Sequence, residues 1–319
     1  MIGSRVSETQ PLVQEFLRVF NTLRRRRAWN TSVETLRVAA LSLATLELEA
    51  PHTRLEEIAD ELKRRAGWIR PLPSAVRYSL AALILRSGAD PGWIHDEVRR
   101  VRKLFRTQRM AHGGSSEVLA AFLLALRAAP NEVLESSVER TADIFHRWKD
   151  DHPFITGTED YPLAALHASG GGEITELGDR IESIYRELHR SGFGRGSSLQ
   201  LASQVLAFGP WDTAGAVGRY RALGWSFKDH GLRVTRSIYD ELAVLTLSES
   251  PPAEIAESVN GHFNTLRTHK PRPWKEVAFA IASGIQLAAE APGDLRDSQQ
   301  AAMVVCMSAA AARAASCGA

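Results

Sequence analysis

Apolar residues recur along this chain with helical spacing, and one short phrase returns about every forty residues. The phrase is a leucine or β-branched residue followed by alanine, at the start of an apolar helical run. Self-similarity at a fixed period of this length is typical of stacked helical hairpins. The phrase occurs at Val38-Ala39, Leu80-Ala81, Leu119-Ala120, Leu163-Ala164, Leu201-Ala202, Leu242-Ala243 and Val277-Ala278.

An aromatic residue lies on the preceding helix in five of these repeats: Phe105, Phe145, Tyr185, Tyr220 and Phe263. A methyl group lets two helices approach closely, and an aromatic ring fills the wider gap beside that contact. We therefore expect the alanine positions to be packing positions in every repeat.

Glycine and proline clusters separate the helical runs, and no run alternates with the period of two that marks a strand. We expect one all-α domain over 1–319, built from about seven stacked antiparallel helical hairpins and closed by an alanine-rich helix from about 295. The sequence leaves open whether these form an α/α toroid or an open α-solenoid. The predicted pairs are 11–28 with 31–49, 53–67 with 72–87, 91–107 with 115–129, 131–149 with 158–169, 172–191 with 196–208, 211–224 with 232–248, and 252–268 with 273–290.

The composition is that of an ordinary globular protein, with 44% hydrophobic and 24% charged residues. A formal net charge of +2 gives no reason to expect a nucleic-acid partner. The first ten residues lack the apolar core of a signal peptide, and the longest apolar runs, 118–126 and 301–312, are too short to span a bilayer. The two cysteines, Cys306 and Cys317, fit a reducing compartment. We expect a cytoplasmic protein with no membrane partner.

Groups capable of chemistry are densest in the fourth hairpin and in the loop inside it. Extra carboxylates around a helix start can hold a divalent cation through oxygen ligands. On this basis Asp150 and Asp151 are predicted metal ligands, with Mg²⁺ as the expected ion. The predicted acid and base groups are Asp160, His152, Glu159 and His167.

The same residues also fit structural roles. Thr156 or Thr158 would cap the following helix, the acids after them would complement its dipole, and Pro162 would occupy its first turn. Asp150 lies nearly opposite the apolar stripe of its helix, which favours a solvated outer face. His167 shares a face with a packing alanine and would then be a hydrogen-bonded core histidine.

Clusters of cations recur late in the first helices of the early pairs: 24–27, Arg64-Arg65, Arg99-Arg100 and Arg102-Lys103. Cations near a helix C-terminus complement the helix dipole, which explains them without a ligand. The alternative is a basic rim that binds an anionic ligand or partner.

The stretch 152–164, His-Pro-Phe-Ile-Thr-Gly-Thr-Glu-Asp-Tyr-Pro-Leu-Ala, together with the hairpins around it, resembles a family of uncharacterised all-helical bacterial proteins. Members have about this length and carry a Leu-Thr-x-x-x-Asp segment near the middle. Here Ile155 stands in place of the leucine, a conservative change. The resemblance extends over most of the chain and implies an all-α fold, but no reaction, because the family is a domain of unknown function.

Two functions follow as expectations. The first is a small-molecule enzyme or binding protein with a pocket inside an α/α toroid, whose polar end is the acidic fourth hairpin. A divalent metal and a terpenoid or prenyl-diphosphate ligand are refinements of it, and whether the protein is an enzyme stays open. The second is a non-catalytic α-solenoid scaffold for a peptide or protein. Packing of the first hairpin against 252–315 would favour the pocket, and open ends would favour the scaffold.

Overall fold

The computed structural model describes residues 4–27, 32–44, 51–66, 74–127 and 134–290. These residues form fourteen α-helices and contain no strand, which confirms the all-α hairpin fold. The predicted alanine-rich helix from about 295 lies outside the described residues. None of the helices in the described ranges is long and apolar enough to cross a membrane.

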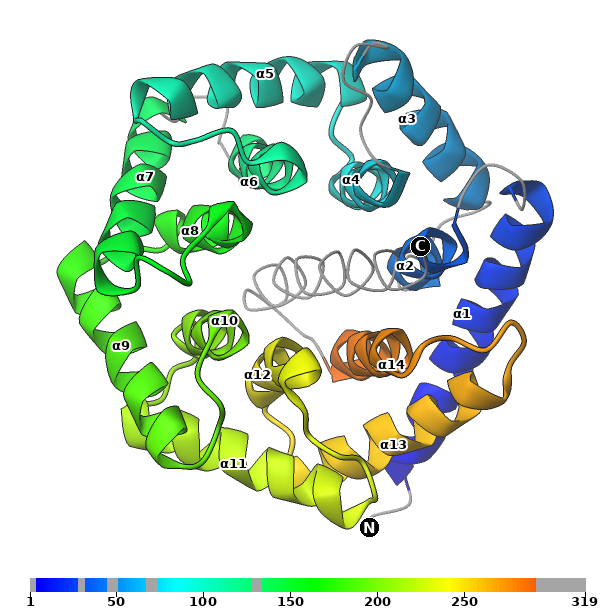
Figure 1. Ribbon diagram of the computed structural model, residues 1–319. Coiled ribbons are helices and arrows are strands. Elements are labelled where there is room, and N and C mark those ends of the chain that lie inside the picture. Colours follow the sequence, from blue (N-terminus) through cyan, green and yellow to red (C-terminus); the bar gives the residue numbers. More distant parts are fainter. Residues whose placement is uncertain (1–3, 28–31, 45–50, 67–73, 128–133, 291–319) are drawn as a thin grey trace.

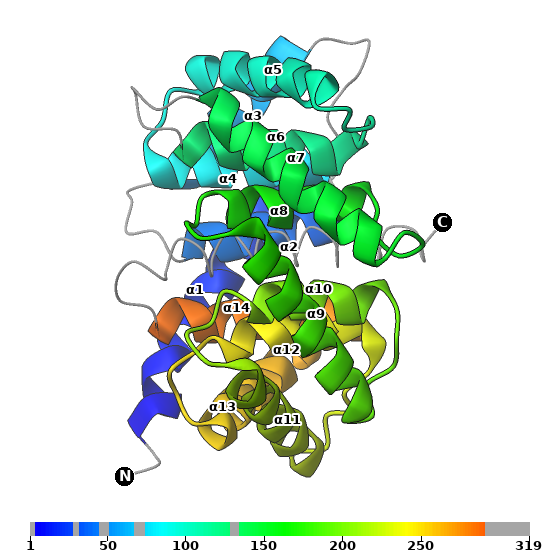
Figure 2. The same ribbon diagram turned by 90° about the vertical axis from the view of Figure 1, so that its left-hand side faces the viewer.

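The helices alternate between an outer and an inner position around a ring (Figure 1). The outer helices are α1 (Ser4–Arg27), α3 (Pro51–Ala66), α5 (Pro91–Thr107), α7 (Leu134–Asp151), α9 (Ile174–Arg190), α11 (Thr213–Asp229) and α13 (Pro252–Thr268). The inner helices are α2 (Val33–Ala44), α4 (Ser74–Ser87), α6 (Gly114–Arg127), α8 (Tyr161–Ala168), α10 (Ser197–Leu206), α12 (Tyr239–Thr246) and α14 (Lys275–Glu290). Short 3-10 turns, η1 (Thr158–Asp160) and η2 (Arg236–Ile238), precede α8 and α12. In the side view, α7 and α9 run across the inner helices (Figure 2).

The first and last pairs lie side by side, so the chain closes on itself (Figure 1). Helix α1 packs against both α13 and α14, and α14 also packs against α2. A Cβ placed on Gly284 of α14 would clash with the Cδ2 atom of Leu41 in α2. The two helices therefore approach each other so closely that a larger residue at 284 would require Leu41 to move.

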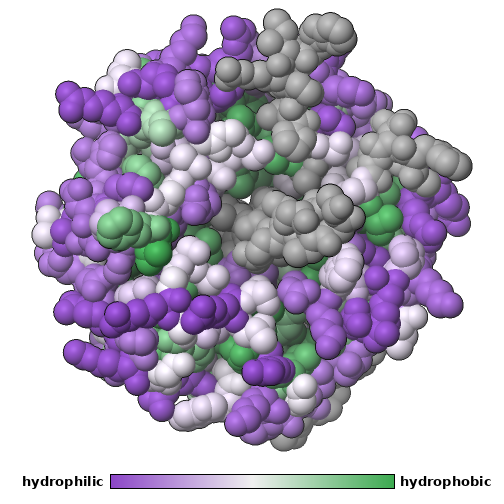
Figure 3. Space-filling model, viewed as in Figure 1, coloured by the Kyte–Doolittle hydropathy of each residue, from purple (hydrophilic) through white to green (hydrophobic). Residues whose placement is uncertain are grey.

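The repeated alanine marks the packed face of every inner helix, as predicted. All seven of these alanines have no exposed surface, and every residue of α8 and of α12 is buried. The outer helices are amphipathic instead, with a single buried stripe that in α9 runs from Gly178 to Leu188. On the face seen in Figure 3, hydrophilic residues dominate the outer ring and apolar residues show between the rings. The core is thus the layer between outer and inner helices.

Helix α9 ends in a Schellman motif that turns the chain toward the inner ring. Gly192 has a φ of 98°, a left-handed conformation that favours glycine. The Phe193 N–H donates to the Leu188 carbonyl (3.2 Å), and the Gly192 N–H donates to the His189 carbonyl (3.0 Å). In this motif the residue after the glycine packs back against the last turn of the helix.

Helices α11 and α5 end in the same way. Gly231 (φ 78°) and Leu232 repeat the arrangement at the end of α11, and Arg109 (φ 59°) and Met110 repeat it at the end of α5. The starts of these two helices also match, because Asp90 and Asp212 each accept the backbone N–H three residues on at 2.7 Å.

Two predicted boundaries in the sixth pair are wrong. Helix α11 continues past Gly224 to Asp229, and α12 begins at Tyr239 rather than at 232. Gly224 does not end the helix: it is buried within α11, and a Cβ built on it would lie 3.8 Å from Leu242, an ordinary van der Waals contact. The true stop signal is Gly231, and the residues after it form a loop and the turn η2.

We expect Arg109→Gly to stabilise the protein by about 1 kcal/mol, because glycine removes the steric cost of the left-handed conformation. The Arg109 side chain is exposed, so its loss should cost little. Chemical denaturation would measure the change. Gly231→Ala is the matched opposite: nothing lies within 4 Å of its added Cβ, so it should destabilise by a similar amount through backbone strain alone. A destabilising Arg109→Gly would contradict this account.

Candidate functional site

Side chains, rather than close backbone packing, join α8 to α10. The Gln200 Nε2 donates to Thr156 Oγ1 (2.7 Å), and the Gln204 Nε2 donates to Asp160 Oδ1 (3.1 Å). The His167 Nε2 donates to the main-chain oxygen of Gln204 (2.8 Å). All five residues are buried. We call this set of residues the α8–α10 seam.

Asp160 is held on both carboxylate oxygens. Its Oδ2 accepts the Gly157 N–H (2.9 Å), and its Oδ1 accepts from Gln204. Burial raises the pKa of Asp160 to about 7, and these two hydrogen bonds oppose the shift. Asp160, one of the predicted acid and base groups, is therefore a buried carboxyl group at the start of α8. It is about half protonated near neutral pH.

His167 is a core histidine. Its ring stacks on Phe208 with centroids 3.7 Å apart and meets the edge of Trp148 at 5.7 Å. Burial lowers the pKa of His167 to about 4, against the opposing effect of its hydrogen bond to Gln204. The imidazole is thus neutral at physiological pH. Its surroundings are those of a hydrogen-bonded core histidine, the structural role that the sequence also allowed.

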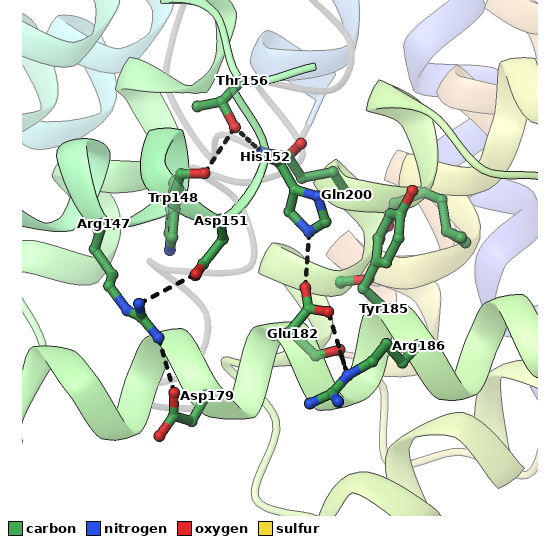
Figure 4. A network of polar contacts seen from close by, with 12 residues as sticks. Arg147, Trp148, Asp151, His152, Thr156, Asp179, Glu182, Tyr185, Arg186 and Gln200 are labelled. Carbon is green, nitrogen blue, oxygen red and sulfur yellow. Dashed lines mark hydrogen bonds and ion pairs between the residues drawn. The ribbon is translucent and has the colours of Figure 1, made fainter. Parts of the chain in front are cut away.

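His152 belongs to a different neighbourhood, between the α7–α8 loop and α9 (Figure 4). Its Nε2 donates to Glu182 Oε2 (2.7 Å), and its ring lies 4.7 Å from the ring of Tyr185. The other Glu182 oxygen meets Arg186 Nε at 3.2 Å. These contacts tie the loop to the outer helix of the next pair.

Arg147 makes a second tie between α7 and α9, also drawn in Figure 4. Its guanidinium contacts Asp151 Oδ1 (3.1 Å) and Asp179 Oδ1 (2.8 Å). Partial burial raises the pKa of Asp151, and the charge of Arg147 opposes that rise. Asp150 and Glu159 are exposed to solvent.

The predicted site residues therefore occupy separate environments. Asp160 and His167 share the α8–α10 seam, His152 pairs with Glu182, and Asp151 pairs with Arg147. Within the described ranges, no group of three or more His, Cys, Asp or Glu side chains is arranged to hold a metal ion. The geometry gives the predicted Mg²⁺ site no support.

A second cluster, which the sequence analysis missed, lies at the end of α11. A cavity of about 480 Å³ opens there, and we call it the rim pocket. Its described lining contains three cations and no carboxylate. The lining residues are Ser191, Phe193, Arg221, Gly224, Trp225, Lys228, Gly231, Leu232, Arg233 and Val234.

The apolar walls of the rim pocket come from the repeated helix ends. Phe193 and Leu232 are the residues that follow the Schellman glycines of α9 and α11. The Phe193 ring meets Tyr220 edge-on at 4.9 Å and Tyr239 at 5.4 Å. Because the backbone motif and the two tyrosines hold it, Phe193 forms a rigid wall.

Arg221, Trp225 and Lys228 share one face of α11, with spacing i, i+4 and i+7. The Arg221 guanidinium lies over the Trp225 ring at 4.8 Å, and 59% of the Trp225 surface remains exposed. Arg233 reaches the same cavity from the loop after the helix.

Lys228 is the second-last residue of α11. In three other outer helices, the side chain at this position donates a hydrogen bond to a carbonyl of the following loop. There Arg106 donates to the Met110 carbonyl, His189 donates to the Phe193 carbonyl, and Arg267 donates to the Pro273 carbonyl. The side chain of Lys228 makes no hydrogen bond or ion pair with any of the described residues. Its ammonium group is therefore available to a ligand.

Five of the cations in the clusters that the sequence singled out pair with carboxylates. Arg64 and Arg65 pair with Glu61, Arg26 lies 3.2 Å from Glu56, Arg100 lies 2.6 Å from Glu135 and Arg102 lies 2.8 Å from Glu117. The basic residues of the rim pocket were missed because the predicted end of α11 at 224 interrupts their common face. The alternation of cation, tryptophan and cation on one helix face is the signal that could have found them.

Comparison with known proteins agrees with the resemblance drawn from the sequence. Residues 19–310 match the family described as "Protein of unknown function (DUF4003)". The chain is also similar to the uncharacterized protein YeaA of Bacillus subtilis, with 21% identity over 286 residues, covering 86% of this chain and 83% of that protein. No solved structure matches the chain significantly.

Asp160→Asn should change how stability depends on pH. At low pH the wild-type carboxyl is protonated in both the folded and the unfolded chain. As the pH rises from about 4, the unfolded chain ionises first, so wild type loses stability relative to the variant until about pH 7. With the pKa raised from 3.8 to about 7, the loss totals about 4 kcal/mol. The Oε1 atom of Gln204, which has no partner among the described residues, can accept a hydrogen bond from the amide that the variant introduces.

Urea unfolding of wild type and Asp160→Asn between pH 4 and 8.5 would measure this difference. Asp143→Asn makes the same substitution at an exposed carboxylate of α7 and is the control, whose stability should follow wild type at each pH. A wild-type-minus-variant difference that stays constant across the range would refute the account of Asp160.

Proposed function

We propose that this chain, which belongs to the DUF4003 family of proteins of unknown function, binds a small organic anion in the rim pocket. One observation carries the proposal: a cavity of about 480 Å³ whose described lining has three cations and no carboxylate. This volume lies in the range of about 300–1,000 Å³ that is usual for small-molecule sites. Hydrogen bonds from cationic side chains to carboxylate or phosphate are among the strongest that proteins make.

The lining also limits the shape of the ligand. Phe193, Leu232 and Val234 provide an apolar wall, while Arg221 and Lys228 provide charge. A molecule that joins an anionic group to an apolar body would satisfy both parts. A prenyl diphosphate, the ligand type expected from the sequence, belongs to this class, and the pocket supplies its counter-charge from its own side chains.

The closed chain supports a pocket protein over an open scaffold. Because α1 packs against α13 and α14, the first and last pairs of the described residues cover each other, whereas an open solenoid would leave both uncovered. We assign these acids and histidines of the fourth hairpin to a structural role. Asp160, His167 and His152 each contact a partner from another segment, and Asp151 pairs with Arg147 of its own helix. The activity proposed is therefore binding.

Removing two of the cations should weaken binding. The double variant Arg221→Gln/Lys228→Gln loses two charge-assisted contacts to the anion, so its dissociation constant for geranyl diphosphate or phenyl phosphate should rise at least tenfold, which corresponds to about 1.4 kcal/mol. Isothermal titration calorimetry at about 0.1 M salt would measure the change, because higher salt screens such contacts.

Arg99→Gln/Lys103→Gln is the matched control. It removes the same charge from two exposed residues of α5, far along the chain from the rim pocket, and should leave the affinity unchanged. Equal affinity of the pocket variant and wild type, or no binding of either probe to wild type, would show that the proposal is wrong.

A further inference from the structure

Trp225 is the most exposed of the tryptophans that the structure describes. A tryptophan is generally well buried, yet 59% of this side chain is exposed, and it lines the rim pocket. Arg221 covers part of one face of the ring at 4.8 Å, a cation–π contact that favours this orientation of the indole. The rest of the aromatic surface is open to whatever enters the cavity.

The pocket contains a second aromatic ring that is already fixed. Phe193 is held by its backbone motif and by edge-on contacts with Tyr220 and Tyr239. A ligand that meets two pre-positioned rings does not have to order them on binding, which lowers the entropic cost. Aromatic pairs also gain stabilisation beyond what their buried area provides, whereas an aliphatic chain gains only from burial.

The charge of the pocket indicates the anionic group. Arg221, Lys228 and Arg233 together carry more positive charge than one carboxylate would balance. A phosphate monoester carries about −1.5 to −2 at neutral pH and offers three acceptor oxygens. The planar forks of two guanidinium groups match such oxygens two at a time, and the ammonium adds a point charge.

We infer that the ligand of the rim pocket is an aromatic ring that bears a phosphate-type group, as a nucleotide does. The inference rests on the proposed function, because it names the class of anion that the same pocket binds. In the bound state the ring lies against Trp225 and Phe193, and the phosphate lies among the three cations.

The end of α13 provides an internal comparison. A second cavity there is lined by Trp274, which is 55% exposed, with Arg267, Arg272 and Lys275. However, Glu276 also lines that cavity, and Arg267 already donates to the Pro273 carbonyl. It offers an exposed tryptophan with less free charge, so Trp274 is the control for Trp225.

The test compares ligands that differ by one part. Calorimetric titrations would use adenosine monophosphate, ribose 5-phosphate, adenosine and geranyl diphosphate with the full chain. We expect adenosine monophosphate to bind roughly tenfold more tightly than ribose 5-phosphate, from stacking of the base. Adenosine, which lacks the phosphate, should bind at least tenfold more weakly than the monophosphate.

Variants then place the ring in the pocket. Trp225→Leu should abolish the preference for adenosine monophosphate over ribose 5-phosphate, Trp225→Phe should retain most of it, and Trp274→Leu should leave it intact. Because both tryptophans are exposed, these variants should keep their fold, which urea unfolding would verify.

The outcomes separate this inference from the proposed function. Equal affinities for adenosine monophosphate and ribose 5-phosphate, or tighter binding of geranyl diphosphate, would overturn the aromatic class while leaving an anion-binding pocket. Loss of the preference in Trp274→Leu instead of Trp225→Leu would place the site elsewhere and overturn the inference. Failure of every probe to bind would remove both proposals together.

Discussion

The close approach of the inner helices is the constraint on which the rest of this fold depends. Each inner helix presents an alanine with no exposed surface, and at the junction of the last and first pairs a glycine, Gly284, takes the corresponding role against Leu41. In an open stack, a larger side chain at one contact could be accommodated by a small rotation of everything beyond it. A closed ring has no such freedom, because α1 must still meet α13 and α14. Small residues are therefore required in every pair.

The α8–α10 seam is the place where that packing is replaced by polar contacts. Buried polar groups are stable only when they are hydrogen-bonded, and here each bond links pair four to pair five: Gln200 reaches Thr156, and Gln204 reaches both Asp160 and His167. Two ties to α9 reinforce the same junction from outside: Arg147 of α7 pairs with Asp179, and His152 of the α7–α8 loop pairs with Glu182. Asp160 and the other seam residues thus compensate for a wider contact between two inner helices, and one consequence is an aspartate whose ionisation opposes folding as the pH rises.

The parts of this structure that sequence could predict are those set by local periodicity. The alanine and aromatic positions repeat, so their burial followed from the pattern, as Ala164 and Phe105 show. The surroundings of Asp160 and His167 did not follow, because the residue that bonds both is Gln204, about one repeat further along the chain. The rim pocket was missed for a different reason. Gly224 resembles a helix stop in the sequence, but the helix continues through it to Asp229. The predicted boundary at 224 therefore divided the face that joins Arg221 to Lys228.

Repetition also explains how a binding pocket can arise without weakening the ring. At the end of α9 the glycine and the apolar residue after it fix the turn through backbone hydrogen bonds, and His189 adds one more bond to a loop carbonyl. At the end of α11 the same backbone bonds are present, but Lys228 adds none to the described residues. The turn is therefore stable without the side-chain bond, because the Schellman motif alone satisfies the last carbonyls of the helix. The second-last position can change from holding the loop to holding a ligand, and in this chain the change coincides with an exposed tryptophan three residues earlier on the same face.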